Sequence, residues 1–237
     1  MNLNFAFLLL LQVVLTLCNT EKIIFQGPSP IQIPTAHPTL EDLQLPALTP
    51  QINTQRTHLR AAFPSASFPE GSATWLQLTN LKSGQRYEVR VCWAATQPTA
   101  FTLSVFDLET VFSSSELITS LAQFSAARQR SSEEEATAKQ ARESFAKEVD
   151  ESMLFFRILA KADYYTMNQT LMKNVPSVHV DIILDPYLLN VFPKSLGPTA
   201  IYIVVLACGA WFLGKVFSAW IINIVSQDEI EKGKKES

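Results

Sequence analysis

Residue types that commonly carry catalysis are few and scattered in this sequence. The histidines His37, His58 and His179 lie far apart along the chain, and no set of His and Cys residues has metal-ligand spacing. Asp181 and Asp185 flank three apolar residues, which matches neither a nucleotide-sugar DxD motif nor a paired-carboxylate hydrolase site. We interpret them as structural, one at a strand end and one in a turn. No glycine-rich phosphate loop, cofactor motif or basic nucleic-acid patch occurs, so the sequence favours an accessory or binding protein over an enzyme.

Two short motifs would be acted on by other proteins. Asn168 opens the sequence Asn-Gln-Thr, the acceptor pattern for N-glycosylation, in a polar turn between predicted strands. Lys234 and Lys235 belong to the last four residues, which match the KKxx pattern read by cytosolic coat proteins. That pattern returns type I membrane proteins to the endoplasmic reticulum (ER). We therefore predict a glycan at Asn168 and coat proteins as partners at the two lysines.

An apolar stretch near the C-terminus is the element that would place these motifs on opposite sides of a membrane. No charged side chain occurs between Leu196 and Gly214, roughly the length that crosses a ~30 Å hydrocarbon core as a helix. We predict one membrane span over 196–225, with Lys215 reaching the nearer interface, and a cytosolic tail over 226–237. More lysines follow the span than precede it, which favours a cytosolic tail. The alternative is a buried helix of a soluble protein.

The N-terminus predicts a secretory signal over 1–20. Its apolar run from Phe5 to Leu17 is too short to span comfortably, and small residues near Cys18 and Thr20 fit a cleavage site. A retained anchor is the alternative. Cleavage would leave a single-pass type I protein of the ER membrane with its N-terminus in the lumen. Its lumenal part, 21–195, contains Cys92 as its one cysteine, which we expect to be a buried thiol without a disulfide.

The sequence of the lumenal part predicts a mainly β fold. Tyr87, Val89, Val91 and Trp93 alternate with polar residues, so they share one face of a strand. Similar patterns precede and follow this strand and return at 153–165 and 178–184, which predicts an antiparallel β-sandwich. The segment 26–69 is too rich in proline for a central strand or a long helix, and its interleaved apolar residues predict an extended segment lying against the domain.

A helical segment interrupts the strands at 113–150. Ser131 and Ser132 each stand three residues before a glutamate, which is the capping-box pattern of a helix N-terminus. Apolar residues are sparse, so we predict a solvated helix inserted in the sandwich. A coiled-coil interaction helix is the alternative.

One apolar stretch lies directly before the predicted span. Tyr187, Leu188, Leu189 and Phe192 offer aromatic and aliphatic area, but prolines on either side prevent the stretch from lengthening the span. Such a segment would lie at the lumenal interface. It would either anchor the span or contact a membrane partner.

The whole layout resembles a known family. A TEKIIF start after the signal, a β-rich domain without disulfides, a DPYLLNVFP segment before one span and a short lysine tail are similar to the fungal co-activators of GPI mannosyltransferase II. The resemblance implies a non-catalytic ER subunit, whose partner is the multispanning enzyme that adds the second mannose to glycosylphosphatidylinositol (GPI) precursors. It places no catalytic residues on this chain, and the insertion at 133–150 has no counterpart in the family pattern.

A second hypothesis is a p24-like cargo receptor of the early secretory pathway. Such receptors also combine a lumenal sandwich, one span and a lysine tail. They usually carry a lumenal cysteine pair and a diphenylalanine signal in the tail. Here Cys92 is unpaired and the tail has no phenylalanine, so the co-activator is the favoured hypothesis.

Overall fold

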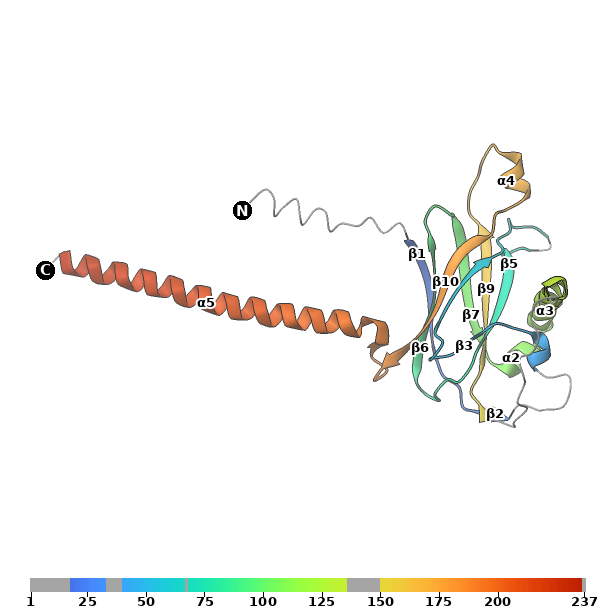
Figure 1. Cartoon of the computed structure of the whole chain (residues 1–237), viewed down its shortest axis with the longest axis horizontal. Coiled ribbons are helices and arrows are strands. Elements are labelled where there is room, and N and C mark those ends of the chain that lie inside the picture. The colour runs from blue at the N-terminus through green and yellow to red at the C-terminus, as the bar shows by residue number, and fades with distance from the viewer. Residues whose placement is uncertain (1–17, 33–39, 67, 136–149, 236–237) are drawn as a thin grey trace. The chain divides into compact units, whose positions relative to one another are not determined.

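The computed structural model describes residues 18–32, 40–66, 68–135 and 150–235 of the 237-residue chain. It contains two compact units, one ending at Val191 and the other beginning at Phe192. The first unit is a β-sandwich with helices on one face, and the second is dominated by a single helix (Figure 1). The predicted mainly β fold with one C-terminal apolar helix is confirmed. The predicted signal lies, up to residue 17, outside the described residues.

The first sheet of the sandwich pairs strands that are distant in sequence. Four of its five strands are, in spatial order, β1 (Cys18–Gln26), β6 (Arg86–Ala94), β10 (Val178–Leu188) and β4 (Thr54–Leu59). These pairings are antiparallel. The alternation predicted for β6 is confirmed, because Tyr87, Val89, Val91 and Trp93 are all buried and face the other sheet.

The second sheet lies between the first sheet and the helices. Its strands are, in spatial order, β3 (Ala47–Leu48), β5 (Ser72–Leu78), β9 (Leu154–Ala162) and β7 (Thr99–Phe106). β3 runs parallel to β5 and the other pairs are antiparallel. A separate short ladder joins β2 (Ile31–Gln32) and β8 (Asp150–Glu151).

The second sheet has apolar residues on both faces because both faces are covered. On β9, Phe156 and Ile158 enter the core between the two sheets. Their neighbour Phe155 points the other way, toward the helices, and packs there with Trp75 of β5. The sandwich therefore has one main core and a second apolar cluster beneath the helices.

Two helices cover the second sheet. They are α2 (Leu108–Ser113) and α3 (Ser115–Glu135). The Asp107 carboxylate caps α2 by accepting a hydrogen bond from the Thr110 amide at 2.7 Å. The Thr110 side chain, together with this amide bond, lowers the pKa of Asp107 below its ordinary value. At the start of α3 the Ser114 hydroxyl accepts a bond from the Leu117 amide at 3.4 Å.

The predicted capping box at Ser131 and Ser132 is wrong, because both residues lie in the last turns of α3. The prediction of a solvated helix is also wrong for its first half. Leu117 and Leu121, one helical turn apart, are buried in the cluster beneath the helices. Residues 136–149, which hold the rest of the predicted helical segment, lie outside the described residues.

The described parts of the proline-rich segment lie against the sandwich. It contains the short helix η1 (Leu40–Leu43) together with β3 and β4. Leu43 and Leu45 pack into the cluster beneath the helices, while Leu48 is buried in the main core. β4 is the longest regular element here, and it lies at a sheet edge, where neighbouring prolines are tolerated.

The second unit consists of β11 (Phe192–Pro193), the short helix η2 (Lys194–Leu196) and the long helix α5 (Gly197–Lys235). The stretch Lys194–Ile222 has a mean hydropathy of 2.0, long and apolar enough to cross a membrane. Its large apolar side chains are exposed all round, including Ile201 and Leu213 at 67% each. A helix that is apolar all round and unburied is typical of a membrane span. The helix continues through Lys215, whose ammonium lies 4.4 Å from the centre of the Trp211 ring.

Candidate partner-contact site

The turn that follows β10 presents an exposed leucine at its tip. The Val191 amide donates to the Leu188 carbonyl at 3.0 Å, which closes a four-residue turn. Leu189 and Asn190 at its centre have φ values of 52° and 58°. Two successive positive φ values define a type I′ turn, which favours asparagine and glycine. Leucine in this conformation costs about 1–2 kcal/mol. Because the Leu189 side chain is 93% exposed, packing within the chain does not offset that cost.

Hydrogen bonds fix the position of this turn on the sandwich. The Asn190 side chain accepts a bond from the Arg86 amide at 2.8 Å and donates one to the Gly84 carbonyl at 3.1 Å. The Gly84 amide in turn donates to the Gly27 carbonyl at 2.9 Å. Gly27 lies so close that an added Cβ would collide with the Lys82 carbonyl oxygen. The exposed leucine is therefore held by a rigid base.

Tyr187, which was predicted to offer aromatic area at the lumenal interface, is buried and is not part of the exposed surface. It is 7% exposed, and its hydroxyl donates to the Glu88 carboxylate at 3.4 Å. The Arg86 guanidinium lies 5.8 Å from the centre of its ring. Burial, with a further contribution from the Glu88 charge, raises the pKa of the Tyr187 hydroxyl.

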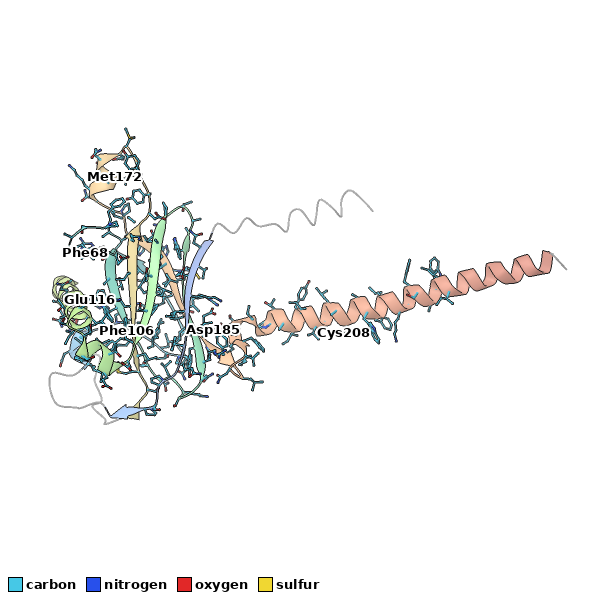
Figure 2. All side chains as sticks on the ribbon, turned by 180° about the vertical axis from the view of Figure 1, so that it is seen from behind. Phe68, Phe106, Glu116, Met172, Asp185 and Cys208 are labelled. Atoms are coloured by element: carbon cyan, nitrogen blue, oxygen red, sulfur yellow. The ribbon has the colours of Figure 1, made fainter. Side chains whose placement is uncertain are left out.

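A buried ionic cluster supports Tyr187 from the same face of the first sheet. Glu88 is 2% exposed, and its two oxygens contact the Lys22 ammonium at 3.2 Å and the Arg90 guanidinium at 3.3 Å. Arg90 also lies 3.8 Å from the Asp185 carboxylate. Asp185 was predicted in a turn, but it lies within β10, in the sheet away from α3, and is buried (Figure 2). Each carboxylate has a cationic neighbour, so the cluster is suited to holding strands together.

Other predicted residues lie apart from this cluster. Asp181, on β10, forms a two-pronged ion pair with Arg56 of β4 at 2.7 and 2.9 Å, and this bond lowers the pKa of Asp181. Cys92 was predicted to be a buried thiol. It is half-buried instead, because it lies on the outer face of β6, where its sulfur accepts a bond from the Thr20 hydroxyl at 3.5 Å.

The predicted glycan acceptor lies on an exposed loop. Asn168 caps the short helix α4 (Gln169–Lys173), and its side-chain oxygen accepts a bond from the Thr170 amide at 3.0 Å. Its side chain is exposed, as are those of its neighbours Gln169 and Thr170. The side chains of Lys234 and Lys235, the predicted retrieval signal, lie outside the described residues.

The predicted contact residues thus separate into distinct environments. Leu188 is 39% exposed and Leu189 93% exposed, whereas Phe192 belongs to the second unit and is half-buried. The structure adds Val191, which is 71% exposed. Sequence reasoning also missed Glu88, because its place on the polar face of an alternating strand is typical of a solvent-exposed residue. Among the residues that the structure describes, no group of His, Cys, Asp and Glu could hold a metal ion.

Comparison with known proteins identifies a family for the chain. No curated protein and no solved structure matches the chain. One family model does match, and it extends over residues 8–216, which include the whole sandwich, the turn and the first half of α5. The chain belongs to the family of GPI-mannosyltransferase II co-activators.

Proposed function

We propose that the chain is a non-catalytic accessory subunit of the mannosyltransferase that adds the second mannose to GPI precursors in the ER membrane. Family membership supports a partnership with that enzyme. The strain and exposure of Leu189 are the observation that supports a contact at particular residues. Its backbone has a positive φ, its side chain is exposed to solvent, and the apolar helix begins eight residues later. Backbone strain that no internal packing offsets is typical of functional surfaces.

In this proposal the enzyme buries the tip of the turn. Leu188, Leu189 and Val191 would enter an apolar surface on a multispanning catalytic subunit, and Phe192, the next residue in sequence, would be a further contact. The hydrogen bonds of Asn190 keep the turn in one conformation before binding. Little conformational entropy would then be lost on association.

Co-purification tests this function directly. The tagged full-length chain, extracted from membranes in mild detergent, should retain the mannosyltransferase that adds the second mannose. Recovery of secretory cargo and coat proteins in its place, without the transferase, would contradict the proposal and support a p24-like receptor.

The proposed topology is type I, with a cleaved signal, the sandwich in the ER lumen and the tail in the cytosol. Asn168 should then carry a glycan, because its exposed loop is accessible to the lumenal enzyme that attaches N-glycans. We expect endoglycosidase treatment to increase the mobility of the protein on a gel. The Asn168→Gln variant should run at the deglycosylated position with or without the enzyme. Unchanged mobility of the untreated and treated wild type would show that the site is not used.

We also propose that Lys234 and Lys235 hold the protein in the ER through cytosolic coat proteins. Replacing both lysines with serine removes the two charges that the coat would bind. The double variant should acquire Golgi-type glycan processing at Asn168, whereas Lys232→Ser should leave the glycan in its ER form. Complete ER residence of the double variant would assign retention to the partner enzyme.

A further inference from the structure

A cleft of about 890 Å³ opens in the sandwich on the side of α3. Its walls come from β4, the beginning of β5, the loop between these strands and the first half of α3. β4 and β5 are neighbours in sequence but belong to different sheets, so the loop must pass from one sheet to the other. β3 pairs with β5 only at Gln77 and Leu78, which leaves the start of β5 uncovered along the cleft. The volume is in the range of small-ligand sites.

Neutral hydrogen-bonding side chains dominate the polar part of the lining. Thr57 of β4 and Thr74 of β5 lie on the strand faces that turn toward the main core, two residues before the buried Leu59 and Leu76, and each threonine is half-buried at the cleft. Thr119 and Gln123, one helical turn apart on α3, line it from the opposite side. Hydroxyl and amide groups both donate and accept hydrogen bonds, as a ligand rich in hydroxyls requires.

The formal charges of the lining almost cancel. Three arginines and two glutamates face the cleft, leaving one net positive charge: Arg60, Arg128, Arg157, Glu70 and Glu116. An anion such as phosphate is usually held by a larger excess of cations. The lining therefore suits a neutral polar ligand better than a charged one.

Aromatic rings complete the site. Phe68 is 42% exposed at the cleft, and Phe124 of α3 lines it too. The loop holds Phe68 through paired backbone bonds with Ser65, both 3.1 Å long. The same loop ends at Gly71, where φ is +88° and an added Cβ would collide with the Ala160 carbonyl. Figure 2 shows Phe68 and Glu116 on the α3 side of the sandwich. The electron-rich faces of such rings pack against the C–H groups of sugars.

Arg157 provides donors at the base of this site. Its guanidinium lies against the rings of Trp75 and Phe106, 5.8 and 5.2 Å from their centres. The guanidinium also forms an ion pair with the Glu116 carboxylate at 3.4 Å, and this carboxylate is 82% exposed. The buried Nε of Arg157 has no hydrogen-bond partner among the described residues. The side chain is thus fixed by packing while its N–H donors are incompletely used.

We propose that this cleft binds carbohydrate, namely the mannose-containing glycan of the lipid on which the transferase acts. This inference rests on the proposed function for the identity of the glycan. Hydroxyl and amide side chains would bond the sugar hydroxyls, Phe68 and Phe124 would pack against the ring faces, and Arg157 would bond a pair of neighbouring oxygens. The chain would then present the acceptor glycan to the enzyme bound at the Leu189 turn.

Binding of α-linked mannobiose to the purified full-length chain tests the proposal, in a detergent whose head group is not a sugar. Titration calorimetry should give saturable binding to the wild type. Gln123→Trp places an indole in the cleft from an exposed helix position and should weaken binding at least about tenfold. Ala122→Trp, on the neighbouring exposed position outside the cleft lining, should change it less than about twofold.

Three results would overturn the proposal. The first is that mannobiose shows no saturable binding to the wild type, and the second is that Gln123→Trp binds mannobiose as tightly as the wild type does. The third is that the one-mannose GPI precursor, in mixed micelles, does not compete with the disaccharide. Competition by the precursor would identify a glycolipid as the ligand of the cleft. Absence of competition would indicate that the ligand is a free sugar. Co-purification of the transferase with the same wild-type sample is measured in parallel. Retained enzyme without mannobiose binding would refute the cleft alone and leave the accessory role intact.

Discussion

Replacing Leu189 with asparagine should release the mannosyltransferase without destabilising the sandwich. Asparagine tolerates the φ of 52° at this position better than leucine does, so the turn should fold at least as well. The variant loses the apolar side chain that is 93% exposed in the free chain. Burying one such side chain contributes about 1.5–3 kcal/mol, so association should weaken about ten- to a hundredfold.

The measurement combines two readouts on the same samples. Enzyme recovered with the tagged chain should fall for Leu189→Asn, while the unfolding midpoint stays the same or rises. Leu171→Asn is the matched control, because Leu171 is 37% exposed on α4, in a different loop of the sandwich. Equal enzyme recovery with wild type and Leu189→Asn would exclude the turn as the contact surface.

Phe156→Ala should have the largest effect on folding. Phe156 is fully buried between the two sheets, next to Ile158 of the same core. Removing a buried phenylalanine leaves a cavity and costs about 3–5 kcal/mol. This is a large share of the ~5–15 kcal/mol by which domains are typically stable.

Chemical denaturation of the full-length protein in detergent would measure this loss, with fluorescence of Trp75 and Trp93 as the probe of the sandwich. Ile52→Ala is the control, since Ile52 is 71% exposed and should change stability by less than about 0.5 kcal/mol. A denaturation midpoint for Phe156→Ala equal to that of the control would mean that the main core is not centred on β9.

The strands could be predicted from the sequence because their side chains alternate. The period of two at Tyr87, Val89, Val91 and Trp93 indicates one buried face, and the structure has those residues in the main core. The partners of each strand could not be predicted. β5, β6 and β7 follow one another in sequence but alternate between the sheets, so β6 pairs with β1 and β10. Pairing over such separations depends on the whole core, which local patterns do not describe.

The helical insertion shows a second limit of local patterns. Two serines before glutamates match a capping box, yet they lie in the last turns of α3, whose first turn is capped by Ser114. Serine also occurs inside helices, so this pattern alone does not locate a helix N-terminus. The buried apolar stripe of the helix is needed as well. That stripe consists of Leu117 and Leu121, which are too few to stand out in a polar sequence.

The apolar residues before the span mark a candidate contact surface in the sequence, but the exposure of each side chain could not be assigned from residue type. Tyr187 is buried because β10 extends further than its alternation predicts, and its hydroxyl meets Glu88. Leu189 is exposed because the backbone turns there. Backbone conformations of this kind leave a signal in the sequence only when glycine or asparagine occupies the position, as Asn190 does here.

The most direct test of the co-activator function is the number of mannoses on GPI precursors in cells that lack this chain. The account predicts that precursors with one mannose accumulate and that anchored surface proteins decrease, because the second transfer needs the complete enzyme. Re-expression of the wild-type chain should restore two-mannose precursors, and Leu189→Asn should restore them less well. Precursors of normal mannose content in the deletion cells would contradict the account.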